Sequence, residues 1–69
     1  MLTIRLKEDY IKLGQALKAA GLVGSGVEAK IVIQDGLVTV NEKTEYQRGK
    51  KLYDKDIVAY NGETVRIIK

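Results

Sequence analysis

Three short stretches of the chain have the apolar content and partial alternation that are typical of β-strands. The first is Leu2–Leu6, and the other two are Ile57–Tyr60 and Thr64–Ile68. The last two flank Asn61-Gly62, a dipeptide favoured in tight hairpin turns because both residues tolerate a left-handed backbone. We therefore predict an early strand and, much later in the chain, a β-hairpin.

The middle of the chain contains a further strand signal in Leu37–Val40. Asn41-Glu42 follows it and predicts a turn, after which Thr44–Gln47 can return as an extended segment. The stretch Lys51–Asp56 is mostly polar, so we expect a loop there.

The segment Lys12–Ala20 has the spacing of an amphipathic helix. Its apolar residues fall at positions i, i+3, i+4 and i+7: Leu13, Ala16, Leu17 and Ala20. Glu8 and Asp9 offer a start for this helix, because acidic residues favour a helix N-terminus. Gly21 follows the last apolar position and predicts the helix end.

The segment between these two regions supports two interpretations. A β-branched run at Ala29–Gln34 precedes Asp35-Gly36, which by local rules is a hairpin signal. Ser25 with Glu28 three positions later instead matches a capping box. On that second interpretation a helix covers Gly26–Asp35 and ends at a left-handed glycine. The local pattern alone leaves both open.

Composition limits the size of the core. Sixty-nine residues make one domain, over positions 1–69, and the chain has no Phe and no Trp. Ile, Val and Leu must therefore supply the core, and we expect nearly all of them to be buried. Tyr46 or Tyr53 could stack on a base, but in a chain so poor in aromatic residues we expect both in the core. Few apolar residues then remain for a small-molecule pocket.

The chain has no Cys and no His, which removes the commonest nucleophile and base as well as the commonest metal ligands. No acidic and basic residues form an obvious catalytic set, so we expect neither an enzyme nor a cofactor. No apolar run is long enough to cross a membrane, and Met1–Arg5 is no signal peptide. We expect a cytoplasmic protein.

Net charge is +3 with a pI near 9.3, which by itself indicates little. The distribution of charge is more informative, because Arg48–Leu52 gathers three cations around a glycine just after the expected turn. Ser25–Lys30 has the pattern of a capped helix start with a cation one turn in. Helix starts have free N–H groups and a partial positive charge, so the two segments together predict a phosphate site. We interpret this site as part of an RNA-binding surface.

The order of these segments resembles the RNA-binding domain first known from small-subunit ribosomal protein S-four, also called the alpha-L motif. It is most similar to the small stand-alone bacterial YaaA/YbcJ type. The resemblance covers essentially the whole chain and rests on these residues: Tyr10–Gln15, Ala16–Lys18, Ser25–Lys30, Gly36–Asn41, Arg48–Tyr53, Asp56 and Asn61–Glu63. The chain departs from the family pattern at Val27, Glu42 and Lys55, where glycine is usual.

This resemblance implies an α+β fold, with two short helices packed on a small, mostly antiparallel β-sheet. It favours the helical interpretation of Gly26–Asp35. It also implies a surface that binds structured RNA, with ribosomal RNA as a candidate, and places these residues on or near it: Lys12, Lys18, Ser25, Gly26, Lys30, Arg48, Gly49, Lys50 and Lys51. The alternative function is a non-enzymatic protein-interaction module of similar fold, which would bind its partner with little dependence on salt.

Overall fold

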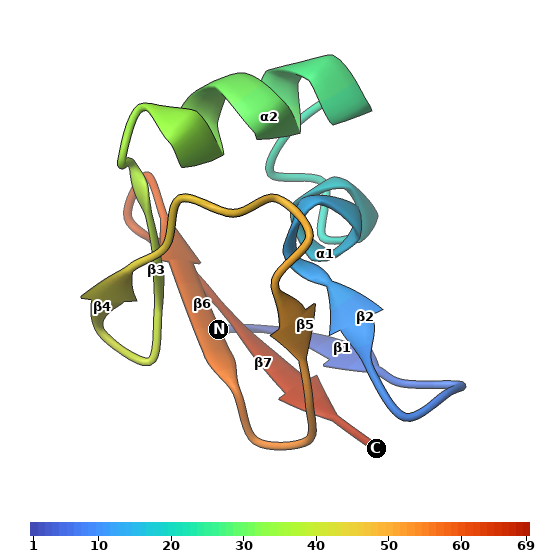
Figure 1. The fold of residues 1–69 in the computed structure, drawn as a ribbon. Coiled ribbons are helices and arrows are strands. Elements are labelled where there is room, and N and C mark those ends of the chain that lie inside the picture. Colours follow the sequence, from blue (N-terminus) through green and yellow to red (C-terminus); the bar gives the residue numbers. More distant parts are fainter.

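The computed structural model describes all of residues 1–69 and contains seven strands and two helices (Figure 1). In chain order the elements are β1 Leu2–Arg5, β2 Ile11–Lys12, α1 Leu13–Ala19, α2 Gly26–Gln34, β3 Val38–Val40, β4 Lys43–Thr44, β5 Lys51–Leu52, β6 Ile57–Tyr60 and β7 Glu63–Ile68. The strands form a five-stranded sheet in the order β1-β7-β6-β3-β4 and a separate ribbon, β2–β5. The α+β fold class is therefore confirmed.

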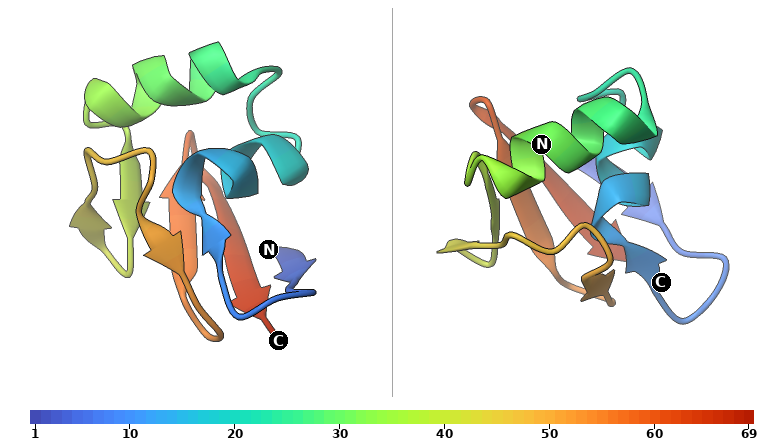
Figure 2. Two further views of the ribbon diagram at one scale, coloured as in Figure 1. Left: turned by 45° about the vertical axis from the view of Figure 1, so that its right-hand side comes forward. Right: turned by 45° about the horizontal axis from the view of Figure 1, so that its top comes forward.

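The five-stranded sheet is antiparallel except at one edge, where β1 runs parallel to β7. The predicted hairpin is confirmed, because β6 and β7 pair across Asn61-Gly62. Both turn residues are left-handed, with φ of 53° and 80°. In Figures 1 and 2 the helices and the β2–β5 ribbon lie to one side of this sheet.

The turn between β3 and β4 has the same left-handed pair without a glycine. Asn41 has φ 52° and Glu42 has φ 72°, and Lys55 in a later turn has φ 77°. Glu42 and Lys55, where the family pattern has glycine, thus adopt a left-handed backbone that is costly for side chains other than Asn or Asp. The Asn41 side chain supports its turn by donating to Asp56 Oδ1 at 3.0 Å and accepting from Ile57 N–H at 2.9 Å.

Both predicted helices are present, and the hairpin interpretation of Ala29–Gln34 is wrong. Ser25 is the N-cap of α2, and its Oγ accepts from Glu28 N–H at 3.1 Å. The capping box closes differently from the sequence prediction, because the Glu28 carboxylate accepts from Gly24 N–H. Gly36 ends α2 with φ 77°, the left-handed value that the helical interpretation requires.

The core lies between the helices, the ribbon and the inner face of the sheet. Its largest fully buried side chains are Leu13, Leu17, Ile33, Leu52, Ile67, Val38, Val58 and Val65. The alternation along β7 follows the pleat, since Val65 and Ile67 point inward while Arg66 between them is exposed. One face of the sheet is thereby committed to the core.

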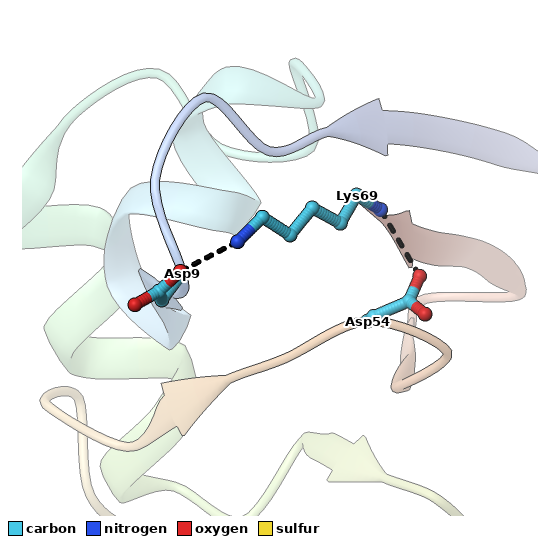
Figure 3. A network of polar contacts seen from close by, with 3 residues as sticks. All are labelled: Asp9, Asp54 and Lys69. Carbon is cyan, nitrogen blue, oxygen red and sulfur yellow. Dashed lines mark hydrogen bonds and ion pairs between the residues drawn. The ribbon is translucent and has the colours of Figure 1, made fainter.

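The start of α1 differs from the sequence prediction. Glu8 and Asp9 lie in the connection after β1, and α1 begins only at Leu13, directly after β2. Asp9 instead forms an ion pair with the Lys69 side chain, and the backbone N–H of Lys69 donates to Asp54 Oδ1 (Figure 3). Asp9 therefore binds Lys69 rather than the start of α1.

The prediction of a loop over Lys51–Asp56 is wrong at Lys51–Leu52, because these two residues form β5 and pair with β2. Ile11 faces Leu52 and Lys12 faces Lys51 in this antiparallel ribbon. Two-residue strands have no local pattern, and these two pair across about forty residues of chain, so the ribbon is invisible to local rules. The return strand predicted at Thr44–Gln47 is likewise reduced to β4.

The expectation that almost every apolar residue is buried was also wrong. Four aliphatic side chains are exposed: Leu2, Val27, Ile31 and Leu37. Tyr46 and Tyr53, predicted in the core, are 61% and 49% exposed. The helices and the ribbon fill the interior with aliphatic residues alone, so the tyrosines remain at the surface.

Candidate functional site

A groove of about 340 Å³ lies where the start of α1, the loop before β5 and the start of α2 meet. Its lining contains no apolar side chain and no carboxylate: Lys12, Gly14, Gln15, Lys18, Gly26, Arg48 and Gly49. We call this surface the basic groove. Five of its residues were candidate site residues from the sequence, namely Lys12, Lys18, Gly26, Arg48 and Gly49.

One wall of the basic groove is a loop docked on the start of α1. Leu13 N–H donates to the Lys50 carbonyl at 2.8 Å, and Gly14 N–H donates to the Arg48 carbonyl at 3.0 Å. These N–H groups have no partner inside the helix, so the loop satisfies donors that would otherwise need another partner. These backbone hydrogen bonds hold the loop in place and thereby fix the point from which the Arg48 side chain extends.

Gly14 allows the Arg48 side chain to lie across α1. A Cβ built at residue 14 would come within 2.6 Å of Arg48 Cγ, which is too close for any real contact. The absence of a side chain at this position therefore gives the stem of Arg48 its place beside the helix. The guanidinium that it carries has five donors in a planar fork, which suits paired phosphate oxygens.

The other wall is the start of α2. Ser25 Oγ occupies Glu28 N–H, but the N–H groups of Gly26 and Val27 donate to no acceptor within the protein. Gly26 lines the groove and has no side chain to cover these donors. The helix start adds a partial positive charge to that of Lys12, Lys18 and Arg48, so the groove is built to attract anions.

The structure divides the cations that the sequence analysis grouped around Ser25. Lys50 and Lys51 line a different hollow, of about 430 Å³, that also contains Glu45 and Asp56. Lys51 Nζ lies 4.8 Å from the centre of the Tyr10 ring. Ser25 and Lys30 are exposed on α2 but line neither hollow. Mixed charge makes the second hollow less suited to phosphate than the basic groove.

Three residues near these cations carried the family resemblance but were not candidate site residues: Tyr10, Gly14 and Gln15. Gly14 and Gln15 line the basic groove itself. Tyr10 precedes β2 and packs against Tyr53, which follows β5, with ring centres 6.0 Å apart. No local signal identifies this pair, because Tyr10 and Tyr53 come together only through the pairing of β2 with β5.

Other kinds of site find little support. No group of three or more acidic, His or Cys side chains could hold a metal ion. Neither helix has the length and apolar character needed to span a bilayer. The pKa of Asp9 is lowered from its ordinary value of 3.8 by the hydrogen bond from Lys69 and then by its charge, but this pair does not line the basic groove.

Comparison with known proteins identifies the family. The model of the S4 domain matches residues 4–68. The chain belongs to the S4 domain family. It is 39% identical over 59 residues to RlbA of Bacillus subtilis (strain 168), a probable ribosome maturation protein, with 86% of this chain and 83% of RlbA covered. It is 31% identical over 62 residues to YbcJ of Escherichia coli (strain K12), which is named for RNA binding, with 90% and 89% covered.

The fold agrees with that of a solved relative. The solution structure of Escherichia coli YbcJ superimposes with a TM-score of 0.77 at 31% identity, covering 100% of this chain and 89% of YbcJ. That structure is described as containing an alpha-L motif involved in RNA-binding. The resemblance drawn from the sequence is thus confirmed at the level of both family and fold.

Proposed function

We propose that this S4 domain protein binds structured RNA and that the basic groove receives the phosphate backbone. The basic groove carries this proposal, because it joins three cations and an open helix start in one hollow free of carboxylates. Phosphate contacts from Lys, Arg and backbone N–H groups supply much of the affinity of proteins for nucleic acids. The names of RlbA and YbcJ point the same way.

The proposal extends to the kind of RNA. RlbA is named for ribosome maturation, so ribosomal RNA, or a precursor of it, is the candidate target we propose. Shape rather than sequence would guide recognition, since grooves that read phosphates carry no direct sequence information. We also propose that the protein works as a binding module in the cytoplasm, and its lack of catalytic activity stays a prediction.

A charge-matched pair of triple variants tests the groove. Lys12→Gln, Lys18→Gln and Arg48→Gln together remove its three cations. Lys43→Gln, Lys55→Gln and Arg66→Gln remove the same charge from exposed positions that do not line it. We expect the groove variant to flatten the slope of log affinity against log salt by about 2 to 3, because each phosphate contact contributes about 0.7–0.9.

Fluorescence anisotropy with a labelled RNA hairpin, titrated between low and physiological salt, measures both variants. Equal losses of affinity in the two triples would show that net charge, not the groove, determines binding. Affinity that is insensitive to salt in the wild-type protein would instead favour the protein-interaction alternative. Crosslinking in cells, with the groove variant as control, then identifies the RNA.

A further inference from the structure

A third hollow, of about 550 Å³, adjoins the basic groove at Gln15 and Lys18. It lies between the region of β1 and the outer side of α1, and half of its lining is apolar: Ile4, Leu6, Tyr10, Ile11 and Ala19. Gln15 and Lys18 line this hollow and the basic groove alike. The two sites are therefore continuous, and one is polar while the other is half apolar.

Tyr10 forms an exposed aromatic wall of this hollow. Its ring packs against Tyr53 at an angle of 50°, and the Lys51 ammonium lies 4.8 Å from its centre. In the next pair of the ribbon, Leu52 is buried in the core and Ile11 packs against it, so the β2–β5 ribbon fixes where Tyr10 lies. Tyr10 is nonetheless 38% exposed. Because the ring is fixed yet accessible, stacking a ligand on it would cost little side-chain conformational entropy.

The remaining lining has the chemistry of a nucleotide site. Three cations, Arg5, Lys7 and Lys18, outnumber the single carboxylate of Glu8. Gln15 has an amide nitrogen without a partner in the protein, while its oxygen makes only a long contact of 3.4 Å with Lys12 N–H. An apolar floor, an aromatic face and an amide are the groups that hold a base. The volume is within the range of small-ligand pockets.

We infer that this hollow receives one unpaired base of the RNA whose phosphates lie in the basic groove, with Tyr10 stacking on the base. This inference rests on the proposed function, since Lys18 links the base site to the phosphate site. A base inside a duplex is stacked on both faces and cannot reach Tyr10. The protein should therefore prefer RNA with a bulged or looped-out nucleotide over a fully paired stem.

The experiment compares two RNA hairpins that differ by one bulged nucleotide. The bulge carries 2-aminopurine, whose fluorescence is quenched when it stacks on an aromatic ring. We expect wild-type protein to quench this fluorescence and to bind the bulged hairpin about tenfold more tightly than the paired one. The same comparison in Tyr10→Leu should show no quenching and no preference, while affinity for the paired hairpin and the salt slope stay unchanged.

Two further variants separate stacking from folding. Tyr10→Phe retains the ring and should behave as wild type, and Tyr46→Leu removes a different exposed tyrosine as a matched control. Wild-type protein that binds both hairpins equally without quenching overturns the base site but leaves the proposed function standing. Loss of the preference in Tyr46→Leu as well as Tyr10→Leu also overturns it. Wild-type protein that binds neither hairpin overturns the proposed function and the base site together.

Discussion

The two helices of this protein begin in different ways, although both starts border the same groove. The start of α1 is closed, because the carbonyls of Lys50 and Arg48 occupy its Leu13 and Gly14 N–H groups. The start of α2 is open, because only Ser25 Oγ caps it and Gly26 N–H has no protein partner. Equivalent backbone donors thus serve structure at one helix and remain available for a ligand at the other.

The difference shows how a small domain places both positioned cations and free backbone donors around one groove. The closed start fixes a loop that is distant in the sequence, and this loop carries Arg48 to the groove. The open start contributes N–H groups that need no further ordering when an anion arrives. A site assembled from both kinds of start has positioned cations on one side and ready donors on the other.

Removing the anchor of the closed start should have the largest effect. Leu52 is fully buried in β5, next to the loop that seals α1. We expect Leu52→Ala to lower the free energy of unfolding by about 2–5 kcal/mol, because it leaves a cavity in the core. That is a large share of the stability of a domain of this size. Urea unfolding followed by circular dichroism measures it.

Leu37→Ala is the matched control, because Leu37 is exposed just before β3. Its effect should remain within about 0.5 kcal/mol. A small effect in both variants would mean that the ribbon does not hold the loop against α1, and the contrast between the two helix starts would lose its structural basis.

The cap of the open start should have an intermediate effect. Ser25→Ala removes the one side-chain acceptor at the start of α2 and should cost about 1 kcal/mol of unfolding free energy. Lys12→Ala at the equivalent position of α1 should cost less than half as much, because the Lys12 side chain makes no capping hydrogen bond. Equal losses in thermal or urea unfolding would show that the two starts are not held differently.

Gly14→Ala tests the contact between the closed start and Arg48. The new Cβ would displace the Arg48 side chain, whose Cγ lies 2.6 Å from its position. Stability should change by less than about 1 kcal/mol, since alanine's better helix propensity offsets the displacement. RNA affinity should fall as far as it does in Arg48→Gln, a few fold in an anisotropy titration. Unchanged RNA affinity in Gly14→Ala would show that binding does not depend on where the Arg48 side chain lies.

The smallest effect concerns the acidic residues once assigned to the start of α1. Asp9 has a lowered pKa because of Lys69, so Lys69→Gln should raise that pKa back toward 3.8 in an NMR titration. A carboxylate whose pKa is lowered in the folded protein stabilises the fold at any pH above its ordinary pKa. That contribution is lost as the pH falls through the lowered pKa. The effect on unfolding should be slight, because the pair is exposed. An Asp9 pKa that stays low would point to a helix start as its cause.

Much of the fold was predictable because its signals are local. The i, i+4 spacing of Leu13 and Leu17, the Ser25 cap and the Asn61-Gly62 turn each identify their element from a few neighbouring residues. The β2–β5 ribbon was missed because its two strands have no local pattern and meet only through tertiary pairing. Ala29–Gln34 was ambiguous locally, and packing of α2 on the core decided it.

The site was predictable in kind but not in arrangement. Charge and glycine near Arg48, and the cap at Ser25, indicated phosphate chemistry. They could not show that Lys50 and Lys51 face a different hollow, because side-chain direction in the loop follows from its docking on Leu13 and Gly14. Tyr10, which we propose stacks on a base, was not a candidate from the sequence for a related reason, since its position depends on a strand pairing that the sequence does not display.

The parallel pairing of β1 with β7 has a consequence for the timing of folding. Leu2 lies opposite Val65, so β1 finds its partner only after all the elements between β1 and β7 have been made. Contacts so distant in sequence fold slowly, because a large loop must close before they form. On a translating ribosome the sheet cannot close until β7 has emerged from the exit tunnel. The β1 edge of the sheet therefore forms only after every other element of the domain has been made.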